Sequence, residues 1–400
     1  MRPMLSDSSC LGLEPSMSYY PFGNRNPEPS LLNPDMTSPL LKRTPLFDSL
    51  TRAGGRMVDF HGWELPVQFA GILAEHQAVR TACGVFDVSH MGQIFLAGRE
   101  AHRFVEHVNC NRMSAVPGRG TYAHLLAEDG GILDDAITFC LGPERFLAIV
   151  NAATCHDDFA WFRQQAEGWD VALDNASDRF GMLAVQGPNA PALVADLFPA
   201  ARTLPRFGIV EVPFGGGMAI LMRTGYTGEE GFEIAASPAG IQEVWEELMR
   251  RGGQHGLVPC GLGSRDTLRL EAGYLLYGQD ADTTRTPFEA NCGWVVKLQK
   301  GDFIGREALI RRQEAGFREK LTGVRLLERG VPRHGCAVWR GDRQIGTLTS
   351  ATFAPSLGTG IGLGYLQPDA WEPGTRVAVE IHHKRVVAET VRGPFRKNKV

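Results

Sequence analysis

The chain changes its repeating pattern near residue 320, and this change limits the folds that it can adopt. Before that point extended apolar runs alternate with helical patterns, whereas afterwards only short extended runs remain, separated by glycine and proline. Short, regularly spaced strands are typical of a small β-barrel or sandwich, and the combination predicts an α+β protein with an all-β C-terminal part. The short runs lie at 322–326, 336–340, 344–349, 360–366 and 376–381.

The region before residue 320 is predicted to begin at Thr44, an N-cap residue followed by proline at the first helical position. Helices are expected over 72–83, 155–166, 241–251 and 264–276, the last capped by Ser264. Glycine-rich turns, above all the one at 128–131, separate the extended runs. These runs lie at 85–88, 93–96, 121–126, 136–140, 146–150, 182–185 and 218–223.

Residues 1–43 differ from the rest of the chain. They hold seven prolines among Ser, Asn and Gly, a composition that cannot bury enough apolar surface to offset the entropy of ordering. They contain no apolar signal-peptide core, and their four acidic residues argue against a mitochondrial transit peptide. We expect a disordered extension here, or an over-long start of the reading frame.

Cysteine spacing, hydropathy and charge disfavour several classes of function. The eight cysteines are scattered without a CxxC pair, so neither a zinc site nor a disulfide framework is expected. No apolar run reaches the roughly 18 residues of a membrane span. The net charge is −4 and basic runs with interleaved aromatics are missing, so nucleic acid is a weak candidate partner. No glycine cluster matches the dinucleotide-binding fingerprint.

Two adjacent carboxylates, Asp134 and Asp135, enter a run that otherwise reads as a buried strand. Neighbours on a strand point to opposite faces, which places one Asp toward solvent and the other toward the interior. An interior carboxylate is costly unless it is paired or used. The alternative is an Asp at the end of a turn that caps backbone amides.

The segment 223–234 reads Arg-Thr-Gly-Tyr-Thr-Gly-Glu-Glu-Gly-Phe-Glu-Ile. Its three glycines would let backbone approach a flat ligand closely. Glu233 stands between Phe232 and Ile234, where an apolar residue would cost less. A carboxylate can accept two parallel hydrogen bonds from the edge of a ligand such as pterin. The alternative is an ion-paired glutamate on an edge strand.

Arg265 and Arg269 lie four residues apart on one face of the helix predicted over 264–276. Two like charges at this spacing repel each other, so an anionic group is expected nearby. That group is either a ligand or simply Asp266 or Glu271. The segment 300–307, Lys-Gly-Asp-Phe-Ile-Gly-Arg-Glu, reads as a turn into a helix, and no catalysis follows from it.

Taken together and in this order, these segments resemble the aminomethyltransferase family of the glycine cleavage system, over residues 44–395. The stretches Gly-Tyr-Thr-Gly-Glu at 225–229 and Arg-Asp-Thr-Leu-Arg-Leu-Glu-Ala-Gly at 265–273 carry most of the resemblance. It implies a three-domain folate-binding fold, with two intertwined α+β domains over 44–320 and a β-barrel over 321–400. Supporting stretches are 59–63, 66–68, 86–92, 185–188 and 276–280.

The same resemblance assigns roles to residues. In the proteins that the chain resembles, the second Asp of the Asp-Asp pair is the essential acid, which is Asp135 here. The position of Glu233 corresponds to the glutamate that holds the pterin, and Arg265 to an arginine that contacts folate. Four further side chains would line the folate pocket: Tyr122, Tyr226, Tyr274 and Ile137.

The implied reaction moves the carbon of an aminomethyl group, carried on the lipoyl arm of H-protein, to tetrahydrofolate. Ammonia is released and 5,10-methylenetetrahydrofolate forms. Tetrahydrofolate acts as a co-substrate, and no metal, flavin or NAD is expected. The location implied is the bacterial-type cytoplasm rather than the mitochondrial matrix.

Two other functions remain open from the sequence. One is a folate-dependent demethylase of a small methylated substrate, although the flavin-linked proteins of that kind carry an N-terminal dinucleotide domain for which 1–43 is too short. The other is a non-enzymatic folate-binding factor for iron–sulfur assembly. Asp302 stands where that group has a cysteine, which argues against this reading.

Overall fold

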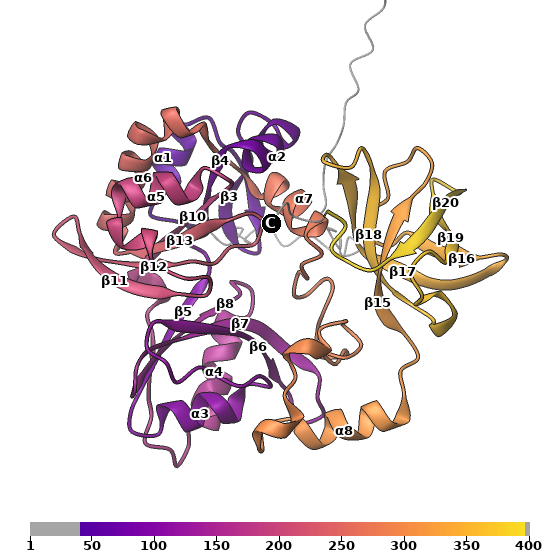
Figure 1. Ribbon diagram of the computed structural model, residues 1–400, viewed down its shortest axis with the longest axis horizontal. Coiled ribbons are helices and arrows are strands. Elements are labelled where there is room, and N and C mark those ends of the chain that lie inside the picture. Colours follow the sequence, from indigo (N-terminus) through magenta and orange to yellow (C-terminus); the bar gives the residue numbers. More distant parts are fainter. Residues whose placement is uncertain (1–40, 397–400) are drawn as a thin grey trace, which may run out of the picture. The chain divides into compact units, whose positions relative to one another are not determined.

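A computed structural model describes residues 41–396 of the chain. Its strands form three open sheets and one closed barrel, with helices packed around the sheets (Figure 1). The α+β class and the C-terminal barrel predicted from the sequence are therefore confirmed. Of the extension expected over 1–43, residues 1–40 lie outside the described part of the chain. The predicted domain boundaries stay predictions.

A six-stranded sheet has the order β11-β12-β13-β10-β4-β14. Residues of alternate parity along its strands enter two different hydrophobic clusters, because successive side chains of a strand point to opposite faces. One face packs against α1 (Phe47–Arg52), α5 (Ala190–Leu197) and α6 (Pro238–Gly252). The strands are β4 (Cys83–Asp87), β10 (Gly181–Gln186), β11 (Ile209–Phe214), β12 (Gly217–Met222), β13 (Gly231–Ala236) and β14 (Leu257–Pro259).

A five-stranded sheet, ordered β6-β7-β8-β5-β9, is formed by the chain between β4 and β10. One face packs on α3 (Ala101–Val108) and α4 (Cys155–Gln165). The other face packs on the six-stranded sheet, since Phe139 and Leu147 share a cluster with Phe86 and Met182. The strands are β5 (Gly92–Ala97), β6 (Arg119–Leu126), β7 (Ile132–Gly142), β8 (Arg145–Val150) and β9 (Ala172–Asn175).

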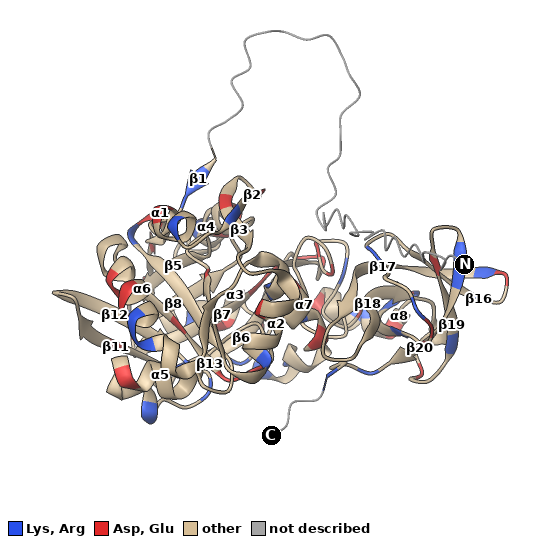
Figure 2. Cartoon of the chain, turned by 90° about the horizontal axis from the view of Figure 1, so that it is seen from above, with Lys and Arg blue, Asp and Glu red and all other residues tan. Residues whose placement is uncertain are grey.

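The barrel closes in the order β15-β18-β17-β16-β19-β20. Its sixth strand, β20, was not predicted from the sequence. It begins with Lys384 and Arg385, and only Ala388 and Thr390 among its eight residues are buried. Acidic and basic positions are interspersed over the barrel strands (Figure 2), as in the pair Arg325–Glu389. The strands are β15 (Lys320–Leu326), β16 (Ala337–Arg340), β17 (Arg343–Ala354), β18 (Thr359–Leu366), β19 (Arg376–Ile381) and β20 (Lys384–Val391).

The helix α7 (Leu262–Glu271) lies between the barrel and the sheets (Figure 1). It packs on α2 (Ile72–Thr81), on β3 (Trp63–Gln68) and on the barrel strands β17 and β18. The prediction of a helix over 264–276 is wrong at its C-terminal end. The helix stops because Gly273, at φ +75°, takes the left-handed conformation that ends helices. After α7 the chain passes through α8 (Arg306–Ala315) to the barrel.

Two predicted helix caps are also wrong. Ser264 lies inside α7, where its buried hydroxyl donates to Gly261 O or to Glu75 Oε2, at 2.9 and 3.0 Å. Thr44 is not the N-cap of α1, which begins at Phe47 after Leu46. Its hydroxyl accepts from the Leu46 amide at 3.3 Å and donates to Asp87 Oδ2 at 2.6 Å. Secondary structure is already present before Thr44, since β1 (Lys42–Arg43) pairs with β3 in a sheet completed by β2 (Arg56–Phe60).

None of the helices within residues 41–396 is long and apolar enough to cross a membrane.

Candidate active site

Asp135 projects from β7 on the face that packs against the six-stranded sheet. Ile137 and Phe139 have the same parity on this strand and belong to the cluster between the two sheets. Asp134 points to the other face, toward α4, and is fully buried. Asp135 is partly exposed, so the expectation that one Asp of the pair lies toward solvent and the other toward the interior is confirmed in part.

Two neutral groups hold the Asp135 carboxylate. Tyr122 Oη donates to Oδ2 at 3.0 Å, and Asn151 Nδ2 donates to Oδ1 at 2.9 Å. Burial and the nearby charge of Asp134 together raise the pKa of Asp135 to about 7. The side chain can therefore bind and release a proton near neutral pH. The alternative reading of this Asp pair as a turn cap is wrong for Asp135, which lies within the strand.

Glu233 projects from β13 toward the five-stranded sheet. Its neighbours Phe232 and Ile234 point to the helical side, whereas Ala235 lies in the cluster between the sheets. The strand is central, with β10 and β12 on its two sides, so the reading as an edge-strand glutamate is wrong. Thr224 Oγ1 donates to Glu233 Oε2 at 2.5 Å, and the side chain is 9% exposed. No basic residue in the described part of the chain forms an ion pair with it.

Arg265 and Arg269, although on one helix, have different surroundings. Arg269 is bound by Asp266 at 2.8 Å and by Asp280 at 2.7 Å, so protein carboxylates satisfy it. Arg265 forms no ion pair among residues 41–396, and its enclosed Nη1 has no hydrogen-bond partner there. Burial lowers the pKa of Arg265, and the charge of Glu233 acts in the opposite direction. An anionic or hydrogen-bond-accepting ligand group would satisfy it.

Aromatic rings adjoin these charged groups. Tyr226 and Tyr274 stack with ring centres 5.8 Å apart, and the Arg265 guanidinium lies over the Tyr226 ring at 4.8 Å. Tyr122 stacks against Trp294, whose side chain is 63% exposed, with ring centres 5.8 Å apart. Such rings offer flat apolar surfaces beside the polar groups.

Two glycines of the loop 223–231 pack against the Gln186 side chain rather than leaving space for the expected ligand. A Cβ at Gly225 would lie 2.0 Å from Gln186 Oε1, and one at Gly231 would lie 2.4 Å from Gln186 Nε2. The glycines are therefore required for packing on the Gln186 side chain. The expectation that they give room to a flat ligand has no support at these two positions.

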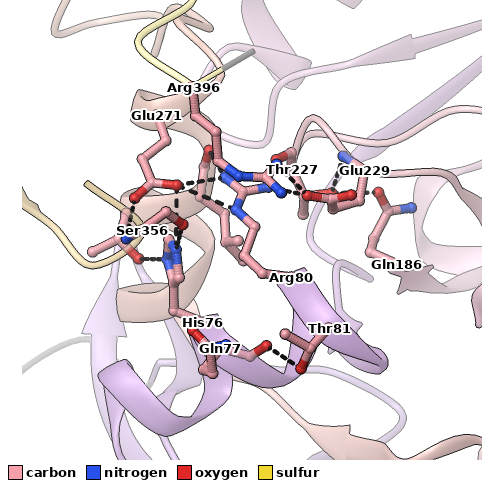
Figure 3. Close-up of polar contacts among 12 residues, drawn as sticks. His76, Gln77, Arg80, Thr81, Gln186, Thr227, Glu229, Glu271, Ser356 and Arg396 are labelled. Carbon is pink, nitrogen blue, oxygen red and sulfur yellow. Dashed lines mark hydrogen bonds and ion pairs between the residues drawn. The ribbon is translucent and has the colours of Figure 1, made fainter. Parts of the chain in front are cut away.

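A network of buried charged side chains holds the loop 223–231 in place (Figure 3). Arg80 on α2 donates to Glu229 Oε1 at 2.9 Å and to Glu271 Oε2 at 3.0 Å. Arg396, from the C-terminal segment, donates to Glu229 Oε1 at 2.6 Å, and the Ser356 amide donates to Glu271 Oε1 at 2.8 Å. The network joins the loop to α7, the barrel and the C-terminal segment.

The predicted site residues thus lie on the facing sides of the two sheets and on the adjoining helix α7. Ile137 lies directly across from Tyr122 in the β6–β7 pairing. The pKa of Tyr226 is raised, mainly by burial and further by Asp135, which connects the two sheets electrostatically. Sequence analysis missed Asn151, Trp294 and Arg80, because each acquires its role from partners distant in the chain.

Comparison with known proteins adds an independent observation. Residues 46–300 match the family profile described as the GCVT N-terminal domain, and residues 319–397 match the glycine cleavage T-protein C-terminal barrel domain. The aminomethyltransferase of Bacillus subtilis is 43% identical over 362 residues, covering 90% of this chain and all of the relative. The aminomethyltransferase of Chlorobium phaeovibrioides is 44% identical, covering 89% of this chain and 99% of the relative.

A solved structure is similar over the same length. It is the glycine cleavage system aminomethyltransferase T from Bartonella henselae, with a TM-score of 0.84 and 32% sequence identity. The similarity covers 89% of this chain and 98% of the solved one.

Proposed function

The chain belongs to the glycine cleavage T-protein family and is an aminomethyltransferase, and from this premise we propose which residues carry its reaction. Tetrahydrofolate binds where the five-stranded and six-stranded sheets adjoin α7, with its pterin at Glu233 and its reacting nitrogens near Asp135. Arg265, Tyr122, Tyr226, Tyr274 and Ile137 complete the binding surface. The donor is the aminomethyl group on the lipoyl arm of H-protein.

One observation carries this proposal: Asp135 and Glu233 project from two different sheets toward the layer that those sheets share. Among residues 41–396, only the Thr224 hydroxyl donates a hydrogen bond to the Glu233 carboxylate, and it does so at Oε2. Oε1 can therefore accept a hydrogen bond from a pterin. The enclosed Arg265 Nη1 needs an acceptor. These two groups fit a polar, flat ligand that carries donors and acceptors along its edge.

Bound tetrahydrofolate supplies two nitrogens, N5 and N10, to receive the transferred carbon. As the two new C–N bonds form, the bonds from this carbon to ammonia and to the lipoyl sulfur break, and the protons of N5 and N10 leave with them as ammonium and the free thiol. Asp135 has two tasks in this proposal. Its ionised carboxylate stabilises the positive charge that develops on the carbon as ammonia leaves, and a fixed charge does so better in a water-poor site than in water. With a pKa of about 7 it also takes up and returns a proton at Oδ1 or Oδ2. Tyr122, whose pKa is raised by burial and by Asp135, keeps its proton and orients the carboxylate.

The relatives identified above support neither alternative function. They are aminomethyltransferases rather than demethylases or iron–sulfur assembly factors. The absence of a metal, flavin or NAD requirement and a bacterial-type cytoplasmic location remain parts of the proposal.

The deciding experiment uses the purified full-length chain with an aminomethylated lipoyl carrier, with and without tetrahydrofolate. We expect rapid ammonia release and 5,10-methylenetetrahydrofolate only when both are present. Small N-methylated substrates serve as the comparison. Their turnover in place of the carrier, with folate bound at the same site, would show that the chain acts as a demethylase.

A further inference from the structure

A third carboxyl group lies behind the Asp134–Asp135 pair. Asp158 on α4 is 3% exposed and Asp134 is 0% exposed. None of the three carboxyl groups forms an ion pair with a Lys, Arg or His of residues 41–396. Two of the three neighbouring carboxyl groups, Asp134 and Asp158, are buried, and Asp135 is partly exposed. Without a cation they are not all ionised, because mutual repulsion and burial both favour the neutral form.

The hydrogen bonds distinguish which group carries the proton. Asp134 receives two donors from one residue, since Asn151 N–H lies 3.0 Å from Oδ2 and Asn151 Nδ2 lies 2.7 Å from Oδ1. These donors suit an ionised carboxylate. Asp158 Oδ2, in contrast, is enclosed and has no donor among the described residues. An enclosed carboxyl oxygen without a donor is satisfied when that oxygen is protonated and itself donates.

Asn151 connects this pair to the candidate active site. Its Nδ2 carries two protons and lies within 2.7 Å of Asp134 Oδ1 and 2.9 Å of Asp135 Oδ1. Movement or protonation of Asp134 must therefore be transmitted to Asp135 through one rigid amide. Asn151 directly follows β8, so a sheet strand fixes its backbone.

We propose that Asp158 is a neutral acid at physiological pH, hydrogen-bonded to an ionised Asp134, and that this pair positions Asp135 through Asn151 and sets the pH at which Asp135 ionises. The inference rests on the role of Asp135 proposed above and extends it. Asp134 and Asp158 are positioning residues, because they reach the substrates only through Asp135.

The electrostatic surroundings agree with this assignment. Burial, then the charge of Asp134 and a hydrogen bond with it, raise the pKa of Asp158 to about 10. Burial also raises the pKa of Asp134, and Asp158 and Asn151 oppose this through hydrogen bonds. The titratable groups facing the three carboxyls are Tyr122 and His124 on β6, Cys155 on α4, and Tyr226, Tyr277 and Cys292 from three further segments. Asp157 on α4 is exposed and has only a small charge effect on Asp158.

The first test titrates aspartate carboxyl carbons by NMR in the full chain labelled with [4-13C]aspartate. We expect one Asp resonance with a midpoint near pH 7 and a second that remains protonated beyond pH 8. In Asp158→Asn the second resonance disappears and the first stays. The proposal is overturned if every aspartate of the unsubstituted protein is ionised by pH 8.

The second test measures the pH profile of kcat/KM. Asp134→Asn removes a charge beside Asp135, so the acidic limb should move down by about one pH unit. Asp158→Ala should lower kcat/KM at least about tenfold, and Asp158→Asn, which keeps a neutral donor, should recover most of that loss. Asp157→Asn is the matched control, since this neighbouring side chain is 89% exposed.

The outcomes separate the two proposals. If Asp135→Asn keeps full activity, the role of Asp135 is wrong, whatever the other variants do. If Asp135→Asn is inactive but Asp134→Asn, folded by circular dichroism, leaves the acidic limb in place, the proposed pair is wrong and the role of Asp135 stands.

Discussion

Asp135 and Glu233 project toward each other's sheet, one from β7 and the other from β13, into the layer where the two sheets pack. Apolar side chains fill the rest of this layer, among them Phe139, Ala184 and Met222. Two carboxylates in such surroundings are costly. Burial and the charge of Asp134 raise the pKa of Asp135, whereas Glu233 accepts a hydrogen bond from the Thr224 hydroxyl. We therefore assign proton exchange to Asp135 and ligand binding to Glu233.

Asp135→Asn should abolish most of the transfer while leaving folate binding intact. The amide has nearly the same shape but cannot be ionised, so we expect kcat to fall by about 10²–10⁴-fold. Steady-state ammonia release measures kcat, and equilibrium titration with tetrahydrofolate measures binding. Glu128→Gln is the control, because Glu128 is exposed in the turn before β7. Near-normal ammonia release with normal folate binding would sink the assignment.

The pH profile should carry an acidic limb with a midpoint near pH 7, because burial and Asp134 raise the pKa of Asp135 to about 7. If the ionised carboxylate is the active form, kcat/KM rises with pH through this midpoint and falls about tenfold per unit below it. Rates measured between pH 5 and pH 9 check this. The same raised pKa makes ionisation costly to the fold, so its contribution to stability decreases as pH rises above about 4 toward 7. A limb centred near pH 4 would contradict the burial of this group.

Glu233→Gln should weaken tetrahydrofolate binding more than it slows the chemistry. A hydrogen bond to a charged acceptor is worth about 1.5–3 kcal/mol, which corresponds to roughly 10–100-fold in Kd. Fluorescence titration measures the binding, and kcat at saturating folate should change less than Kd does. Glu230→Gln is a matched control three residues away, since Glu230 is 43% exposed and pairs with Arg223. Equal effects of both substitutions would contradict a specific role for Glu233.

Arg80→Met should destabilise the fold. Removing the guanidinium leaves the fully buried Glu271 carboxylate with only His76 Nε2, at 3.3 Å, as a basic neighbour, and it leaves Glu229 with Arg396 alone. Loss of one partner from a buried ion pair costs about 3–5 kcal/mol. Urea unfolding followed by circular dichroism measures the change in free energy of unfolding. Arg250→Met, at a position 64% exposed on α6, should cost less than about 1 kcal/mol.

The architecture was accessible from the sequence because its strongest signals are local. The apolar run 146–150 forms a strand that is covered on both faces. Phe146 and Ala148 pack on one face, and Leu147 and Ile149 pack on the other. The turn at 128–131 correctly joins β6 to β7. The end of α7 was mispredicted because the apolar residues after Gly273 continue the helical spacing, while the positive φ of that glycine breaks it.

The partners of the site residues were not accessible, because they come from remote parts of the chain. The Arg269 guanidinium finds Asp280 in a loop and Ser350 on a barrel strand. The need for glycine at position 225 arises from Gln186, on another strand of the six-stranded sheet. Asn151 has no local pattern that marks it, although it holds both carboxylates of the Asp pair. A single sequence gives residue types and spacing, and such contacts depend on tertiary packing.

The strand β4 has a consequence for synthesis on the ribosome. All five of its residues are buried, yet it pairs with β10 and β14, which are translated only after the whole five-stranded sheet. At roughly 5–20 residues per second, β4 waits on the order of ten seconds or more for β14. During this time the nascent chain exposes an apolar strand with two open edges, a state that favours aggregation. Slower elongation over 88–257 prolongs that exposure, so codon usage there should influence the yield of folded enzyme.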